Sequence, residues 1–505
     1  MSAANASPTP TPRRRRIGVD ADHEHYKWWA LSCTSLGMLL ATVNSGTLVI
    51  ALPDLEKALG VGLLTLVWVI LAFMIASTVL VLTFGRLSDL FGRKRAFVAG
   101  FAVFTVASLG AGFATGGTDL IVWRVVQGIG GALLFANASA LVTDAFPREQ
   151  LGVAMGTNVM VAGIGLVLGP VLGGALVEIS WHWVFWFNVP FGIAGTFWAA
   201  TVLQELIRPE VDHRFDWPGT FTFVIGLTGL TYGISRGGIV AWDDTNTIVA
   251  LVAAAVLLPA FIVVERRSPS PMLDLSLFKD RGFAAATGAA FLNGLSRFAL
   301  TFVFVLYFQG ALGDDPILAG VKLAPMALGM LISSPLAGAY ADKHGARSLA
   351  ALGMVVVAIS LGGMTMLGTG SSYALAAFWL LLNGLGSGMF NSPNTAAMMG
   401  TVPAHRRGIA GGTRMMLQNT GSVLSIAFVL AIITAAVPTS VLLSIFSGVT
   451  SGLDDAALAP FIHNMHVALW VLAATAVAGA LVSLLRPSAS PAAPASAGGP
   501  VKVSA

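Results

Sequence analysis

Long apolar segments separated by short polar loops fill most of this chain of 505 residues. A membrane span needs about 20 predominantly apolar residues, and segments of this kind occur fourteen times. We therefore predict fourteen membrane-spanning helices, at about 27–52, 63–83, 96–114, 118–140, 152–177, 183–205, 217–236, 247–264, 284–308, 318–337, 349–369, 374–397, 409–436 and 463–485.

The composition indicates that lipid surrounds most of the chain. Hydrophobic residues make up 56% of the sequence and charged residues only 10%, against about 25% charged residues in a soluble domain. The single cysteine, Cys33, lies within an apolar segment, so the chain has no disulfide framework. The tails at 1–26 and 487–505 are rich in Ser, Pro and Ala and are predicted to be disordered cytoplasmic segments.

The positions of Lys and Arg predict the orientation in the membrane. Most of the 28 basic residues lie in the two tails and in the loops that follow each even-numbered span, and cytoplasmic loops carry such an excess. We predict a multi-pass protein of the cell membrane with both termini in the cytoplasm. The net charge of +4 is then a consequence of topology, and no nucleic-acid partner is expected.

Two motifs recur at a spacing of eight spans and indicate an internal repeat. Gly85-Arg-Leu-Ser-Asp-Leu-Phe-Gly follows the second span, and Gly338-Ala-Tyr-Ala-Asp-Lys-His-Gly follows the tenth, 253 residues later. Leu151-Gly-Val-Ala-Met-Gly and Arg407-Gly-Ile-Ala-Gly-Gly open the fifth and thirteenth spans. The repeat predicts an amino-terminal six-helix bundle at 27–206, two inserted helices with their flanking loops at 207–282, and a carboxy-terminal six-helix bundle at 283–486.

Three local patterns suggest how such bundles would work. Gly92 permits a tight turn after the second span, and Arg93 is within reach of Asp144 at the end of the fourth. Arg124 lies inside the fourth span, where a charged residue costs roughly 2.5 to 3.5 kcal/mol and normally faces a partner or a cavity. The fifth span carries closely spaced small residues and a proline, which favour close helix packing and a kink: Gly165, Gly169, Pro170, Gly173 and Gly174.

These motifs resemble those of the major facilitator superfamily, and the fourteen spans resemble its drug:proton antiporters with fourteen helices. The resemblance implies an all-α integral membrane fold with 6+2+6 helices, and a monomeric secondary transporter that exports drugs or antibiotics in exchange for protons. It implies a small-molecule substrate, lipid surroundings, no cofactor, no metal and no enzymatic activity. It also implies a conformational switch at the loop motif, formed by Gly85, Arg86, Asp89, Gly92, Arg93, Asp144 and Asp342.

The sequence departs from that family at the end of the first span, where Asn44 stands in place of the usual carboxylate. None of the 24 acidic residues lies in the middle of a predicted span, whereas Arg124, Arg297 and Arg414 all do. Two interpretations remain open. The arginines either contact anionic or strongly accepting substrates, or they form structural hydrogen bonds with amide side chains and helix carbonyls.

By the same resemblance, the central cavity is expected between spans 1, 2, 4 and 5 and their repeat counterparts. The candidate residues for substrate binding or coupling are the polar and aromatic residues of these spans: Asn44, Trp68, Arg124, Gln127, Asn137, Asn158, Asn293, Arg297, Asn391, Asn394, Arg414 and Gln418. The alternative function is transport of an anionic metabolite through the intramembrane arginines, without proton coupling at the first span. A membrane enzyme is disfavoured, because no metal-spaced cluster or activated nucleophile is recognisable.

Overall fold

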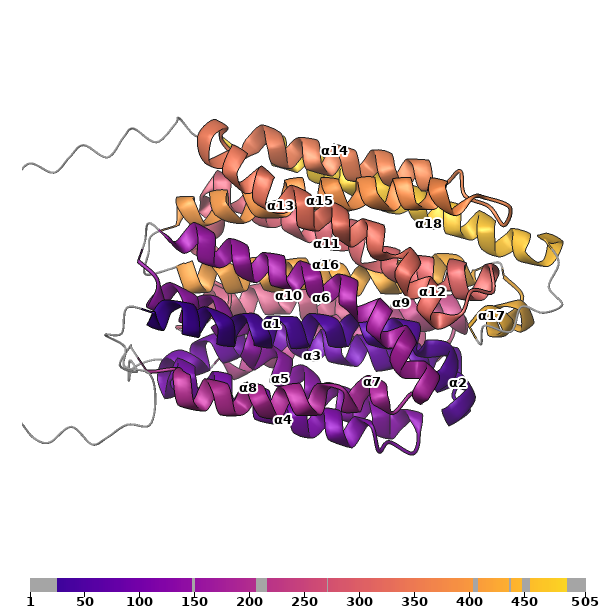
Figure 1. The fold of residues 1–505 in the computed structure, drawn as a ribbon, viewed down its shortest axis with the longest axis horizontal. Coiled ribbons are helices and arrows are strands. Elements are labelled where there is room, and N and C mark those ends of the chain that lie inside the picture. The colour runs from indigo at the N-terminus through magenta and orange to yellow at the C-terminus, as the bar shows by residue number, and fades with distance from the viewer. Residues whose placement is uncertain are drawn as a thin grey trace, which may run out of the picture.

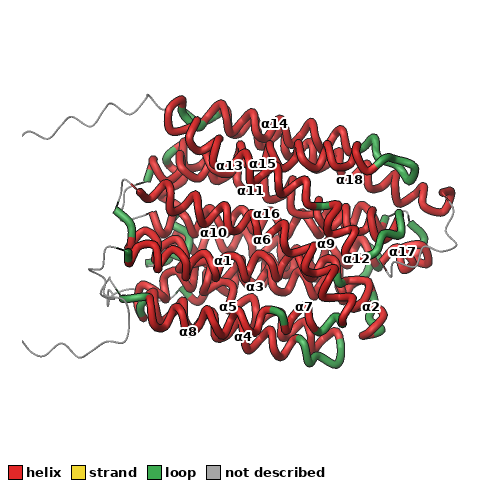
Figure 2. Tube along the Cα trace, in the orientation of Figure 1, coloured by secondary structure: helices red, strands yellow, loops and turns green. Residues whose placement is uncertain are grey.

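The computed structural model describes residues 25–147, 150–205, 216–269, 271–402, 407–435, 437–446 and 455–487. Within these ranges the regular secondary structure is helical, and the long helices run along a common axis with their loops at the two ends (Figures 1 and 2). The predicted tails at 1–26 and 487–505 lie almost entirely outside the described residues.

Long helices occupy all fourteen positions predicted from hydropathy. They are α1 (Tyr26–Ile50), α3 (Leu63–Phe91), α4 (Arg93–Ala111), α5 (Gly117–Ala145), α6 (Leu151–Ile179), α8 (Asn188–Val202), α9 (Trp217–Ile239), α10 (Thr245–Arg267), α11 (Arg281–Val305), α13 (Ala324–His344), α14 (Arg347–Met364), α15 (Tyr373–Thr401), α16 (Arg407–Thr434) and α18 (Asp455–Leu484). Short elements join or extend them: α2 (Leu52–Leu59), α7 (Trp183–Trp186), η2 (Leu275–Lys279), η3 (Leu306–Ala311), α12 (Pro316–Lys322) and α17 (Thr439–Phe446).

Twelve of the described helices are long and apolar enough to cross a membrane, which confirms the all-α membrane fold. The helices at two predicted spans, 183–205 and 217–236, are not among the twelve that meet this criterion of length and hydropathy. The first is divided between α7 and α8, and α8 has only 15 residues. The second is α9, whose glycines, hydroxyl residues and Arg236 lower its hydropathy.

The two halves of the chain repeat the same packing. α4 packs on α5 in the first half, and α14 packs on α15 in the second. A Cβ atom added to Gly130 would lie 2.6 Å from the amide nitrogen of Phe104, and one added to Gly386 would lie 2.8 Å from that of Val357. These pairs are related by offsets of 256 and 253 residues, so the repeat extends to backbone contacts between equivalent helices.

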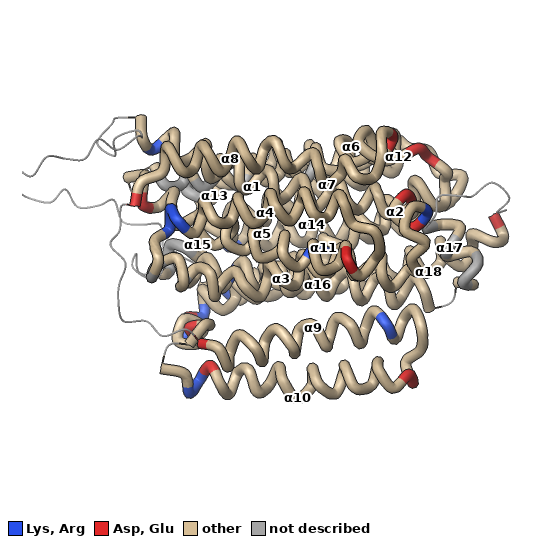
Figure 3. The backbone as a smooth tube through the Cα atoms, turned by 90° about the horizontal axis from the view of Figure 1, so that it is seen from below, with Lys and Arg blue, Asp and Glu red and all other residues tan. Residues whose placement is uncertain are grey.

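The α9–α10 hairpin forms a separate layer beside the two bundles (Figure 3). It contacts both, because the hydroxyls of Thr220 and Thr83 (on α3) lie 3.2 Å apart and Thr434 of α16 donates to the carbonyl of Gly238 at 2.7 Å. At its turn a hydrogen bond from the Arg236 guanidinium holds the pKa of Asp244 below its ordinary value. The hairpin therefore adds to the predicted six-helix bundles without entering either.

The bundles meet closely at the end of the molecule away from the start of α1 and the end of α18, hereafter the distal end (Figure 1). A Cβ atom on Gly174 of α6 would lie 2.5 Å from the carbonyl oxygen of Pro316, and one on Gly320 of α12 would lie 2.5 Å from that of Pro170. Nε2 of Gln309 also donates to the carbonyl of Ile50 at 3.4 Å. Backbone from one half thus contacts backbone from the other at this end.

Candidate functional site

Arg124 lies inside the first bundle with only 1% of its surface exposed. Its Nε donates to the backbone carbonyl of Val69 at 2.9 Å, and its Nη1 donates to the side-chain oxygen of Gln127. The guanidinium carbon stands 4.6 Å from the centre of the Phe73 ring, a cation–π distance. These contacts correspond to the structural interpretation of this arginine, since its partners are neutral groups of α3 and of its own helix.

Gln127 links Arg124 to an amide cluster. Its Nε2 donates to Oδ1 of Asn44 at 3.1 Å and to the hydroxyl of Ser108 at 2.7 Å, and Asn188 donates to the same Asn44 oxygen at 3.3 Å. The position that carries a carboxylate in the resembled family therefore acts here as a hydrogen-bond acceptor within a network of uncharged side chains. Neither Ser108 nor Asn188, the first residue of α8, was among the residues predicted for this site.

A small cavity lies between the two bundles, and Arg297 is its one charged lining residue among those described. α1 contributes Ser45 and Val49, α3 contributes Ile70, and α11 and α16 contribute Phe298 and Ile426. The Arg297 side chain is half-buried, and its recorded contact is Nη1 at 3.8 Å from the sulfur of Met330. Of the twelve candidates predicted from the sequence, Arg297 is the one in the described lining of this cavity.

The other candidates lie at contacts between or within helices. Arg414 donates to Gln418 at 2.8 Å, and Gln418 donates to Asn391 of α15 at 3.3 Å. The remaining contacts are Asn158 with Ser35, Asn137 with the carbonyl of Leu133, Asn293 with the sulfur of Met354, Asn394 with the carbonyl of Ala286 and with Arg486, and Trp68 with the ring of Tyr232 on α9. In the described conformation most of these contacts join two helices, whereas those of Asn137 with Leu133 and of Arg414 with Gln418 lie within one helix.

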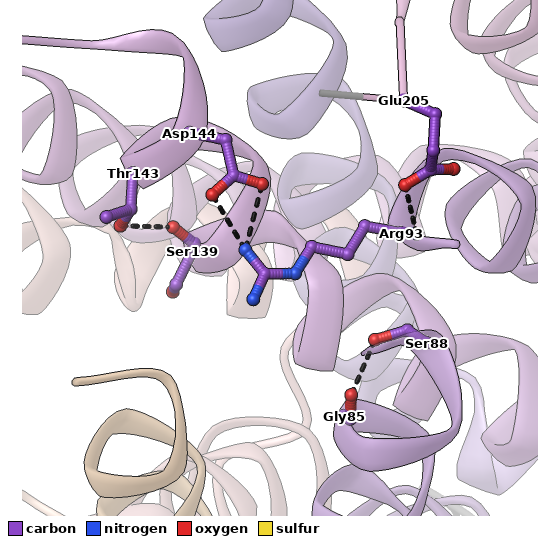
Figure 4. Close-up of polar contacts among 7 residues, drawn as sticks. All are labelled: Gly85, Ser88, Arg93, Ser139, Thr143, Asp144 and Glu205. Carbon is purple, nitrogen blue, oxygen red and sulfur yellow. Dashed lines mark hydrogen bonds and ion pairs between the residues drawn. The ribbon is translucent and has the colours of Figure 1, made fainter. Parts of the chain in front are cut away.

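The loop between α3 and α4 brings together charges from three helices (Figure 4). Nη1 of Arg93 lies 2.7 and 2.8 Å from the two carboxylate oxygens of Asp144, as the sequence predicted. Glu205, just after α8, accepts from the backbone amides of Arg93 at 2.8 Å and Lys94 at 3.2 Å. A carboxylate beside the first turn of a helix interacts favourably with the helix dipole. Glu205 therefore stabilises the first turn of α4.

Gly92 has a left-handed φ of +103°, and Gly345, its repeat equivalent, has a φ of +85°. Both copies of the loop motif therefore end their helix at a glycine with a left-handed φ. Gly85 has open space around it, with the Cβ of Ala136 at 4.0 Å. The side chains of Arg86, Asp89 and Asp342 lie outside the described residues.

The ion pair of Arg93 and Asp144 should stabilise the fold measurably. Their side chains are 19% and 11% exposed, so solvent screening is only partial. We expect a double-mutant cycle of Arg93→Met and Asp144→Asn to give a coupling of about 1 kcal/mol in the free energy of unfolding. Unfolding in detergent would measure it, and a coupling near zero would show that the pair does not stabilise the fold.

The glycines of α6 act at two different contacts. Cβ atoms on Gly165, Gly169 and Gly173 would lie within 3 Å of α1, whereas Gly174 faces α12 of the other half. Pro170 lies inside the helix between them and is itself packed against Gly46 and Gly320. One helix thus carries contacts within its own bundle and contacts between bundles.

Two repeated bundles of membrane helices that enclose a cavity between them define a membrane transporter. The chain matches the family model described as Major Facilitator Superfamily over residues 34–426, with a second match over 286–503. The chain belongs to the major facilitator superfamily.

Its similarity to characterised relatives extends over most of its length. It is 30% identical over 403 residues to the riboflavin transporter RibZ of Clostridioides difficile, which covers 80% of this chain and 87% of that protein. It is 31% identical over 408 residues to the multidrug resistance protein Stp of Mycobacterium tuberculosis, covering 80% and 75% respectively. The crystal structure of the human organic anion transporter MFSD10 aligns with a TM-score of 0.62 at 14% identity, covering 90% of this chain and 99% of that one, and shows the same fold.

Proposed function

We propose that this chain exports amphipathic drugs or antibiotics from the cytoplasm by alternating access, in exchange for protons. It would do so as a monomer in the cell membrane with both termini in the cytoplasm. Alternating access requires two bundles that can rock about a site between them. The observation that carries the proposal is the cavity between the bundles, closed toward the distal end by backbone contacts at Gly174 and Gly320.

Resistance to multiple drugs is in the name of one relative and riboflavin in the name of another. Both names refer to organic small molecules, and the apolar walls of the cavity suit substrates of that kind. The proton-coupling part of the proposal rests on the family resemblance, because the described spans place no carboxylate beside the cavity.

Inside-out vesicles would test the proposal with fluorescent cationic, neutral and anionic amphiphiles. We expect ATP-independent uptake into the vesicles that falls at least tenfold when an ionophore collapses the pH gradient and the membrane potential. Uptake that ignores both gradients would contradict active export.

Two glycines of α6, Gly169 and Gly163, provide a variant and its matched control for testing whether transport needs the contact between α6 and α1. A Cβ atom on Gly169 would lie 2.8 Å from the Cα of Gly46, whereas one on Gly163 would meet nothing within 4 Å. Gly169→Leu should therefore abolish uptake, and Gly163→Leu should keep most of it. Equal activity of the two variants would show that the α6–α1 contact is unnecessary for transport.

A further inference from the structure

Arg297 differs from the other two intramembrane arginines in what it contacts. Arg124 donates to a backbone carbonyl and to Gln127, and Arg414 donates to the oxygen of Gln418. Arg297 has a single recorded partner, the sulfur of Met330 at 3.8 Å, and thioether sulfur is a weak acceptor. A guanidinium carries five N–H donors in a planar fork, so most of the hydrogen-bonding capacity of Arg297 is unused within the described part of the chain.

No described carboxylate forms an ion pair with Arg297. The ion pairs recorded among the described residues are Arg93 with Asp144, Arg236 with Asp244 and Lys322 with Asp314, and all three lie near the ends of the bundle. A charge within a membrane span normally pairs with another charge or faces a water-filled cavity. Arg297 follows the second course, because it lines the cavity between the bundles.

The internal repeat relates Arg297 to one residue of the first half. Equivalent glycine contacts align α1 with α11. A Cβ atom on Gly165 of α6 would contact the carbonyl of Leu39 in α1, and one on Gly421 of α16 would contact that of Phe291 in α11. The offset is 252 residues between α1 and α11, and 256 between α6 and α16. By the same offset of 252 residues, Arg297 is equivalent to Ser45, and both residues line the cavity. In the first half this position carries a hydroxyl that donates to the carbonyl of Ala41, and in the second half it presents a cation to the cavity.

The cavity walls set the rest of the chemistry. Val49, Ile70, Phe298 and Ile426 line the cavity with apolar surface. Two hydroxyl residues, Ser45 and Thr301, also line it, and the hydroxyl of Ser45 already donates to the carbonyl of Ala41. In this conformation about 20 Å³ is open to the centre of a water molecule, enough for one or two waters, so a larger ligand requires the bundles to move apart.

We infer that Arg297 binds the anionic group of the exported molecules, and that the preferred substrates are amphipathic organic anions. This inference rests on the proposed export function and specifies its substrate class. The planar guanidinium matches a carboxylate, sulfonate or phosphate bidentately, while the apolar walls accept the remainder of the molecule.

An anionic substrate also changes the energetics of export. An anion that leaves a cytoplasm of negative potential moves down its electrical gradient. A potential of 100 mV can hold its concentration about 50-fold higher outside than inside. The membrane potential can therefore drive export of an anion without a proton-carrying carboxylate in the described spans.

Two probes with the same apolar body and opposite charge test the inference: pyrenebutyrate and pyrenebutyltrimethylammonium. In proteoliposomes with a potassium diffusion potential, we expect the wild-type protein to transport the anion at least ten times faster than the cation. Arg297→Gln should lower anion transport at least tenfold, mainly through KM, and leave cation transport within twofold. Arg297→Lys should keep a substantial part of anion transport, and Arg236→Gln, which removes an arginine outside the cavity, should keep all of it.

Each outcome separates the inference from the function on which it rests. Export of the cation alone would overturn the anion site and leave drug export standing, and export of neither probe, nor of any other amphiphile, would overturn both. Unchanged anion transport in a folded Arg297→Gln protein would overturn the site. If that variant fails to fold, the preference of the wild-type protein for the anionic or the cationic probe decides whether the inference holds. If replacing gluconate by chloride in the buffer lowers transport of the anionic probe tenfold, an inorganic ion occupies the site, and this result also overturns the inference.

Discussion

Gly174→Ala is expected to reduce export at least tenfold while leaving each bundle folded. The added Cβ atom would lie 2.5 Å from the carbonyl oxygen of Pro316 and 2.7 Å from the Cα of Ile317. Both are backbone atoms of the opposite half, so no side-chain rotation relieves the overlap, and the bundles must separate at the distal end. Small residues are what permit such close approach of membrane helices. Gly320→Ala should have the same effect, because its Cβ atom would meet the carbonyl of Pro170 at 2.5 Å.

Chemical labelling would show the separation directly. The chain has a single cysteine, Cys33, which is buried. In a Cys33→Ser background, a cysteine in place of Val49 reports access to the cavity from the distal side. We expect Gly174→Ala to raise its labelling by an impermeant maleimide at least tenfold, and the matched control Gly163→Ala, with open space around its Cβ atom, to leave it unchanged. Unaltered labelling in both variants would show that these contacts do not close the distal end.

The fold could be predicted from the sequence because its determinants are local and repeated. Apolar length alone locates the long helices, and the spaced glycines of the α3–α4 loop recur 253 residues later, which reveals the two bundles. The contact of Arg93 with Asp144 was also predictable, since both residues lie where spans end at the same side. α9 was predicted as an ordinary span, and its contacts with both bundles, at Thr220 and at Gly238, were not predicted.

The direction of side chains within the spans could not be predicted. In a soluble helix the polar face marks the side turned to water, whereas here both the lipid-facing and the bundle-facing sides are apolar. Trp68 was therefore a cavity candidate, and it contacts Tyr232 of the hairpin. Arg124 and Arg297 look alike in sequence, and only the packing places one within a bundle and the other at the cavity. The contact of Glu205 with α4 joins residues more than 100 positions apart and had no local signal.

Gly92→Ala is expected to destabilise the protein by about 1.5 to 4 kcal/mol, more than the equivalent change Gly345→Ala. Both glycines have left-handed φ angles, +103° and +85°, and a Cβ atom in such a conformation costs about 1 to 2 kcal/mol. At Gly92 the Cβ atom would in addition lie 2.3 Å from Oε2 of Glu205, whereas at Gly345 it would meet nothing within 4 Å. Displacing Glu205 removes the cap of α4, worth about 0.5 to 2 kcal/mol.

A double variant separates the two contributions. In Glu205→Ala the space beside Gly92 is free and the cap is already lost, so adding Gly92→Ala should then cost only the backbone strain, close to the effect of Gly345→Ala. Thermal or denaturant unfolding in detergent would measure all four proteins. An effect of Gly92→Ala equal to that of Gly345→Ala in the presence of Glu205 would show that the carboxylate does not stabilise α4. A larger effect confined to the protein with Glu205 would establish that this loop is held from the end of α8, and that the two halves, alike in backbone, are stabilised differently at their equivalent turns.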